Sequence, residues 1–231
     1  MPKTYVELKG EIIDIQDLLL ILNDKNWSID LIENKYLLTA DIFETINGNY
    51  EILLRAKQFL DILNGVASII YINHIYVTTN AIYRLDENNK LQGIGFLEGN
   101  INCRFRFKAT ITKNVINGKE NLENKYQKWI DKSKSESEIR EILHYFNNQN
   151  WWNLYKIYEI INNDLKKTKI VNLVSKNQLT RFKQTANDNK IIGESARHAT
   201  YNNESIKNPM DINSARMFII DYFEKWIETK L

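Results

Sequence analysis

The stretch that decides the fold class is residues 49–66, which read NYEILLRAKQFLDILNGV. Its apolar side chains recur every three or four positions, so a helix would gather them on one face. The members of this stripe are Ile52, Leu53, Ala56, Phe59, Leu60, Leu63 and Val66. Because helices commonly end at a pair such as Asn64-Gly65, we predict one long amphipathic helix that ends near residue 66.

The segments around this helix have the period of β-strands. Alternating, β-branched and aromatic residues recur between turn residues, and a turn at residues 33–35 predicts a hairpin. The strand candidates are residues 5–8, 27–31, 36–42, 75–83, 91–97 and 102–115. Each is apolar on one side, which predicts an antiparallel meander packed on the 49–66 helix. Residues 14–22 fit a helix or a strand equally.

From Asn117-Gly118 onward the patterns are almost only helical. The helix candidates are residues 139–146, 151–165, 178–187 and 212–226, the last with Asp211 as its N-cap after Pro209. The polar residues 132–138 are either a linker or the start of a helix. We therefore predict an α+β protein with a β-rich domain over residues 1–118 and a helical domain over residues 119–231.

Composition excludes several classes of protein. With 231 residues and 43% hydrophobic residues, the chain can bury a core and is not a disordered segment. The one cysteine, Cys103, excludes an internal disulfide framework and a cysteine zinc site, and three scattered histidines predict no His/Cys metal site. We expect no cofactor, since the phosphate-loop, dinucleotide, serine-hydrolase and zinc-protease motifs are absent. No apolar run approaches a membrane span or a signal peptide, so we expect a cytoplasmic protein.

The candidate catalytic residues lie in residues 193–199, GESARHA. Arg197 can hold a phosphate in a bidentate fork, and His198 can act as a general acid or base near neutral pH. The alternative is a structural role. Adjacent side chains on a helix point about 100° apart, so the two need not converge on one ligand.

Residues 135–229 resemble the helical domains of the HEPN superfamily, with Arg197-His198 followed by a loop, Pro209 and a final amphipathic helix. Those domains commonly carry an Arg, a polar residue, several variable residues and then a His. Many are metal-independent ribonucleases that act at a dimer interface in toxin or phage-defence systems, and others only bind or dimerise. On this resemblance Arg197 matches the Arg and His198 its polar neighbour. Residues 200–204, TYNNE, hold no later His, which favours binding over cleavage.

A basic run precedes this segment and is opposed only by Asp188. Its members are Lys166, Lys167, Lys169, Lys176, Arg181, Lys183 and Lys190. Such an excess can attract RNA or a nucleotide, and we take Arg181, Lys183 and Lys190 with Arg197 as candidate ligand-binding residues. The alternative is a solvated face. Trp151-Trp152 could stack on bases, although its helical spacing favours core packing, with Trp152 the better candidate for exposure.

Two functions remain open from the sequence. The first is a non-enzymatic binding or regulatory protein for an RNA, nucleotide or other phosphate-bearing partner. The second is a HEPN-like metal-independent ribonuclease in which Arg197 holds the phosphate and His198 transfers the proton. A homodimer and a setting in antiviral defence are implied by the resemblance alone.

Overall fold

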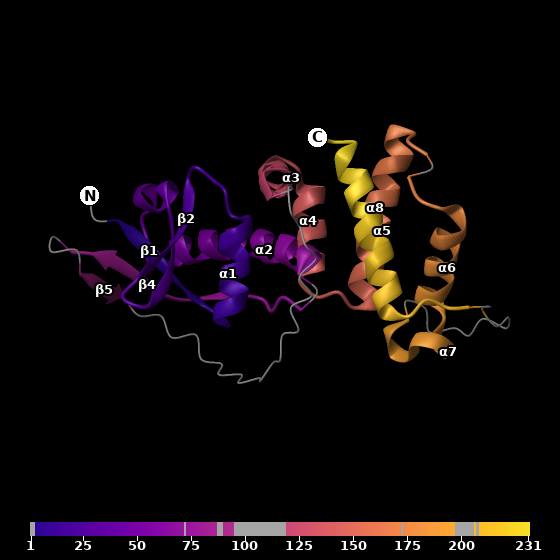
Figure 1. The fold of residues 1–231 in the computed structure, drawn as a ribbon, viewed down its shortest axis with the longest axis horizontal. Helices are drawn as coiled ribbons and strands as arrows, with labels where there is room; N and C mark the ends of the chain where they lie inside the picture. Colours follow the sequence, from indigo (N-terminus) through magenta and orange to yellow (C-terminus); the bar gives the residue numbers. More distant parts are fainter. Residues whose placement is uncertain are drawn as a thin grey trace. The chain divides into compact units, whose positions relative to one another are not determined.

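The computed structural model describes residues 3–71, 73–86, 90–94, 119–171, 173–196, 206 and 208–231. The chain forms two compact units, Met1–Asp131 and Lys132–Leu231, called here the N-terminal unit and the C-terminal unit (Figure 1). An antiparallel sheet lies in the first unit, and helices alone make up the described part of the second. The α+β fold class is therefore confirmed. Within the described ranges, no helix has the length and apolar character to cross a membrane.

The N-terminal unit is built on a five-stranded sheet with the order β2-β3-β1-β4-β5. Its elements are β1 (Thr4–Lys9), α1 (Ile12–Ile21), β2 (Trp27–Ile32), β3 (Lys35–Ala40), the 3-10 helix η1 (Asp41–Thr45), α2 (Asn49–Ile70), β4 (Thr78–Leu85) and β5 (Leu91–Ile94). A further helix, α3 (Lys119–Ser135), crosses the boundary between the units. The central strand β1 pairs antiparallel with β3 and β4, where Val6 faces Leu38 and Ile82.

The predicted hairpin is confirmed. Glu33 and Asn34 both have positive φ angles, 49° and 61°, and Ile32 pairs with Lys35 across them. Two left-handed residues between paired strands define the turn whose twist matches that of the strands. The predicted second strand was too long, because β3 ends at Ala40 and the 3-10 helix η1 follows.

The predicted end of the central helix is wrong, since α2 continues past Asn64-Gly65 to Ile70. The reason is tertiary. The Asn64 side chain is fully buried and donates to the carbonyls of Leu60 and Val77, so it anchors the helix to the segment before β4. Residues 14–22, ambiguous from sequence, form the helix α1. The predicted strand at residues 102–115 lies outside the described residues.

The C-terminal unit packs its helices around α5 (Trp151–Thr168), which contacts both α4 (Ser137–Phe146) and α8 (Ile212–Glu228). The remaining elements are α6 (Lys176–Asn187), α7 (Asn189–Ile192) and the 3-10 helix η2 (Gly193–Ser195). The predicted helices at 139–146, 151–165, 178–187 and 212–226 are confirmed within a few residues. Asp211 caps α8 as expected, since its carboxylate accepts from the amides of Asn213 and Ser214.

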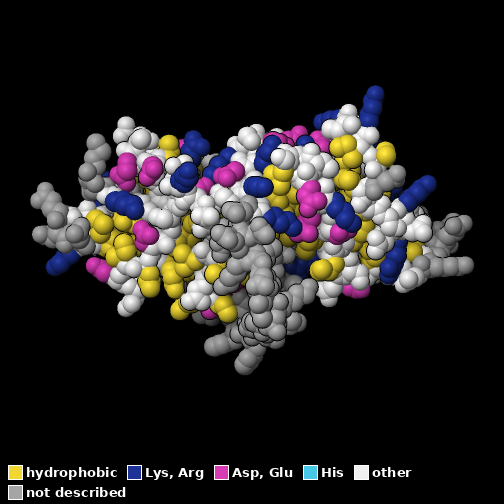
Figure 2. Space-filling model, turned by 45° about the horizontal axis from the view of Figure 1, so that its top comes forward, with side chains coloured by type: hydrophobic (Ala, Val, Ile, Leu, Met, Phe, Trp, Pro, Cys, Tyr) yellow, Lys and Arg dark blue, Asp and Glu magenta, His cyan; other side chains and the backbone are white. Residues whose placement is uncertain are grey.

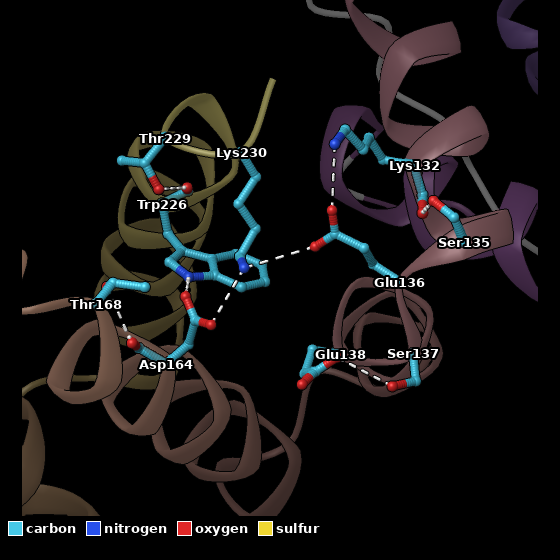
Figure 3. Close-up of polar contacts among 10 residues, drawn as sticks. All are labelled: Lys132, Ser135, Glu136, Ser137, Glu138, Asp164, Thr168, Trp226, Thr229 and Lys230. Atoms are coloured by element: carbon cyan, nitrogen blue, oxygen red, sulfur yellow. Dashed lines mark hydrogen bonds and ion pairs between the residues drawn. The ribbon is translucent and has the colours of Figure 1, made fainter.

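A polar network joins the helix ends of this unit (Figure 3). Its members, called here the C-terminal polar cluster, are Lys132, Glu136, Asp164, Trp226 and Lys230. The Lys230 ammonium lies 3.1 Å from Asp164 and 3.5 Å from Glu136, and Glu136 also pairs with Lys132 at 3.2 Å. The Trp226 indole donates to Asp164 at 2.8 Å. The network therefore fastens α8 to α5 and to the start of α4.

Candidate functional site

Arg197 and His198, the predicted catalytic pair, lie outside the described residues. The described chain reaches Ala196, just after the short 3-10 turn η2. Their proposed chemistry thus stays a prediction.

Arg181 is engaged in holding the chain together. Its Nε donates to the Asn208 carbonyl at 2.6 Å, and a terminal guanidinium nitrogen donates to the Asn208 side chain and the Pro209 carbonyl. Next to it, the Thr185 hydroxyl accepts from the Met210 amide at 3.1 Å. These bonds fix the segment that enters α8, so the geometry gives Arg181 a structural role beside the predicted ligand role.

The structure separates the predicted basic run into groups. Lys183 is exposed on α6, and Lys190 is exposed on α7. Lys166, Lys169 and Lys176 instead line one groove of about 450 Å³ in the C-terminal unit. Figure 2 shows lysine and arginine side chains standing out from this unit, at the right of the view, beside exposed apolar ones.

The groove combines cationic and apolar walls. The described residues that line it include three lysines and no acidic residue. Its apolar lining consists of Leu165, Ile170, Val171, Leu173, Val174 and Leu179, with Asn162 and Tyr222 beside them. Burial, and then the charge of Tyr158, raise the pKa of Tyr222 to about 12. The phenol therefore stays neutral at physiological pH. Such a lining suits a ligand that is anionic at one end and apolar at the other.

Local chain geometry forms this groove. Helix α5 is followed by its C-cap Lys169, which adopts a left-handed backbone with φ 58°. The amides of Lys169 and Ile170 both donate to the Leu165 carbonyl. The chain then turns and enters α6 after Ser175, whose side chain makes no capping hydrogen bond. The first turn of α6 contains no acidic residue. Because the first amides of a helix have no partner within it, the N-terminus of α6 adds positive potential beside Lys176.

The tryptophan pair is divided between core and surface, as predicted. Trp151 is 9% exposed and packs near Phe182, whereas Trp152 is 52% exposed with the Lys156 ammonium 5.4 Å from its ring. Trp152 lies in the first turn of α5 and Lys166 lies near its end, about 20 Å away at about 1.5 Å per residue. Trp152 is therefore not part of the groove.

A second cluster lies in the N-terminal unit, and the sequence did not reveal it. Asp14 and Asp17, one helical turn apart on α1, face His74 from the segment between α2 and β4. The His74 Nδ1 lies 3.6 Å from an oxygen of each carboxylate, and the side chains are 0%, 3% and 8% exposed for His74, Asp14 and Asp17. We call these three residues the buried Asp–His cluster.

Asn64 fixes the proton on one nitrogen of the histidine ring, Nε2. Its amide nitrogen donates to two backbone carbonyls, and its Oδ1 accepts from the Val77 amide at 2.8 Å. The same oxygen lies 2.9 Å from His74 Nε2, so Nε2 must carry the proton of that bond. The Nδ1 edge of the ring therefore faces the two carboxylates.

Sequence reasoning missed this cluster for a definable reason. The three histidines and the cysteine are far apart along the chain, and residues 14–22 fit a helix or a strand equally. Two aspartates three residues apart share one face only if the segment is a helix. An Asp-x-x-Asp pattern within an apolar helix is the signal that could have found them.

The comparisons with known proteins add no relative: no family model, no curated protein and no solved structure matches the chain. The resemblance to HEPN domains therefore stays a prediction.

Proposed function

We propose that the C-terminal unit binds a phosphate-bearing ligand, a nucleotide being the simplest kind, in the groove between the end of α5 and the start of α6. The observation that carries this proposal is the placement of Lys166, Lys169 and Lys176 around one apolar-walled groove. The three lysines come from two helices and the turn between them, so the fold has brought their charges together.

The charges around the groove favour phosphate over a neutral ligand. A lysine ammonium is a compact point charge with three donors, and it binds phosphate oxygens in many orientations. The N-terminus of the 12-residue helix α6 adds backbone donors and positive potential beside Lys176. Together they provide donors for more than one oxygen of a phosphate group.

The apolar lining favours a ligand with a flat or hydrophobic part. Val171 is 73% exposed, and Ile170, Leu173, Val174 and Leu179 are partly exposed around it. The base of a nucleotide could cover this surface while the phosphates of the same nucleotide reach the lysines. A long single-stranded RNA would extend beyond the groove, in the direction in which Lys183 follows Lys176 on the same face of α6.

The biological setting remains a proposal that rests on the HEPN resemblance. It comprises a binding or regulatory role without catalysis, a homodimer and a place in antiviral defence, and the cytoplasmic location rests on composition. No described residue favours the ribonuclease alternative. RNA cleavage by the wild type in EDTA that is lost in Arg197→Ala and His198→Ala would establish that alternative.

The experiment compares two double variants that remove equal charge. Lys166→Gln/Lys176→Gln alters the groove, whereas Lys167→Gln/Lys183→Gln removes two exposed lysines from the same helices outside it. The probe is adenosine diphosphate with a fluorescent N-methylanthraniloyl label, titrated at low salt. We expect at least tenfold weaker binding in the groove variant and less than threefold in the control, since each lost charged contact costs about 1 kcal/mol.

Two results would reject the proposal. One is equal weakening in both double variants, which would indicate attraction by overall charge. The other is an absence of saturable binding by the wild type at millimolar probe. Competition by inorganic phosphate would support phosphate as the recognised group.

A further inference from the structure

We propose that the buried Asp–His cluster of the N-terminal unit binds one divalent transition-metal ion through Asp14, Asp17 and His74. This site is independent of the groove in the C-terminal unit, and either proposal can fail without the other. One carboxylate oxygen or ring nitrogen from each residue lies within 4.8 Å of the other two. The three side chains are almost completely buried, so this is not a surface accumulation of acids.

The separations suit ligands of one ion. Donor atoms at about 2.0–2.2 Å from a common metal lie about 3 to 3.5 Å apart in octahedral or tetrahedral arrangements. The His74 Nδ1 lies 3.6 Å from Asp14 Oδ1 and 3.6 Å from Asp17 Oδ2. Small side-chain rotations would therefore suffice to place all three atoms around a metal.

The surroundings orient the ligands as in metal centres. A metal-binding histidine nearly always donates its other ring N–H to an acceptor, which fixes the tautomer and the direction of the free nitrogen. Here His74 Nε2 donates to Asn64 Oδ1, which in turn is fixed by the Val77 amide. The Asp14 Oδ1 accepts from the Ile75 amide at 3.0 Å. This support comes from α2 and from the backbone, outside the three ligands.

Charge gives a second reason. With a neutral ring, the lone pair of His74 Nδ1 would face two carboxylates in the interior, where such repulsion is weakly screened. A divalent cation between the three groups removes the repulsion and balances both carboxylates. The alternative to a metal ion is a second proton on the His74 ring, which leaves the three groups with a net charge of −1. The two states make different predictions in solution.

The donor set selects the metal. Mg²⁺ and Ca²⁺ prefer sites made only of oxygen ligands, whereas an imidazole with two carboxylates suits Mn²⁺ or Zn²⁺. Because the ion would bind the folded unit through three buried side chains, it would stabilise that unit. It would fasten α1 to the segment that joins α2 to β4.

The test uses the full chain after treatment with a chelator and dialysis. Mn²⁺ and Zn²⁺ are titrated by calorimetry, with Mg²⁺ and Ca²⁺ in parallel, into the wild type, Asp17→Asn and His74→Gln. The matched control is Glu136→Gln, which neutralises a carboxylate of the C-terminal polar cluster. We expect one Mn²⁺ or Zn²⁺ per chain in the wild type and the control. We also expect at least tenfold weaker binding in both cluster variants, and much weaker Mg²⁺ and Ca²⁺ binding throughout.

A second measurement uses the wild type alone, so it tests the proposal even if the variants do not fold. Pulsed electron paramagnetic resonance of the Mn²⁺-loaded wild type should show coupling to one imidazole nitrogen. In ¹⁵N-labelled histidine spectra, Zn²⁺ should shift only one ring of the three. The proposal is overturned if the wild type binds neither ion, or if Asp17→Asn and His74→Gln fold and bind as the wild type does. It is equally overturned if the His74 ring stays doubly protonated at saturating Zn²⁺.

Discussion

Each unit of this protein contains a cluster of carboxylates, which face lysine ammonium groups in the C-terminal unit and a histidine imidazole in the N-terminal unit. The two clusters differ in burial and in charge. In the C-terminal polar cluster, Glu136 and Asp164 face two lysines, and the ion-paired side chains are 15% to 36% exposed. In the buried Asp–His cluster, two aspartates face one histidine, and exposure is at most 8%. The first pairs two negative with two positive charges, whereas the second can at most offset one of its two carboxylates with the ring.

This difference indicates different tasks. Partly exposed pairs are weakened by water and contribute little each, so the C-terminal polar cluster serves to position helix ends. Burying charge is costly unless it is compensated, so the state of the Asp–His cluster has a large effect on the stability of its unit. Charge balance thus distinguishes a cluster that positions helix ends from a candidate binding site.

The largest expected effect is that of removing the histidine. His74→Ala leaves two buried carboxylates facing each other, and should destabilise the N-terminal unit by about 3–5 kcal/mol. Lys230→Ala in the other cluster should cost about 1–2 kcal/mol, since Asp164 keeps the Trp226 bond and Glu136 keeps Lys132, while two partly exposed ion pairs and the contact of Lys230 with the Trp226 ring are lost. Hydrogen exchange measured peptide by peptide in each unit provides both numbers.

The control for this pair is Lys225→Ala. Lys225 pairs with Asp221 on the exposed face of α8, and its loss should change stability by no more than about 0.5 kcal/mol. If Lys230→Ala were as costly as His74→Ala, burial and charge balance would not distinguish the two clusters.

The same contrast explains what the sequence could reveal. The 49–66 pattern, the hairpin and the Asp211 cap are local signals, and each appears in the structure. The helix end at Asn64-Gly65 was mispredicted because the Asn64 amide finds partners 13 residues away in the chain.

The two candidate sites could be predicted from the sequence to different degrees. The lysines of the groove were visible as a basic run, but the turn at Lys169, which places Lys176 in the same groove as Lys166, depends on packing. The buried Asp–His cluster was invisible, since residues 57 and more positions apart meet only through the contact of α1 and α2 with the segment before β4.

An effect of intermediate size is expected on the pKa of a buried tyrosine. Burial first, then the Asp17 and Tyr126 charges, raise the pKa of Tyr71 to about 12, whereas burial and Tyr158 raise that of Tyr222 to the same value. A raised pKa means that the neutral phenol favours folding. That contribution is complete below about pH 10 and is lost as the pH rises through 12. Asp17→Asn should lower the Tyr71 pKa by about half a unit to one unit and leave Tyr222 unchanged.

The measurement is a pH titration of ¹³C-labelled tyrosine by NMR, with Tyr71→Phe and Tyr222→Phe to assign the signals. Asp164→Asn is the matched control in the C-terminal polar cluster and should move neither value. An unchanged Tyr71 pKa in Asp17→Asn would show that the buried cluster exerts no field on its surroundings.

The smallest effect concerns one left-handed residue in each unit, Glu33 in the hairpin turn and Lys169 at the end of α5. A left-handed backbone is less favourable for a residue with a Cβ atom than for glycine. Glu33→Gly and Lys169→Gly should therefore each raise the free energy of unfolding by about 0.5 to 1 kcal/mol, measured by thermal unfolding. The two should then diverge. Lys169→Gly should weaken binding of the fluorescent nucleotide probe several-fold, whereas Glu33→Gly should not affect it. If Lys169→Gly is more stable and binds the probe as the wild type does, the groove does not use the charge of Lys169. If it is more stable but binds more weakly, ligand binding explains why a lysine stands where the backbone favours glycine.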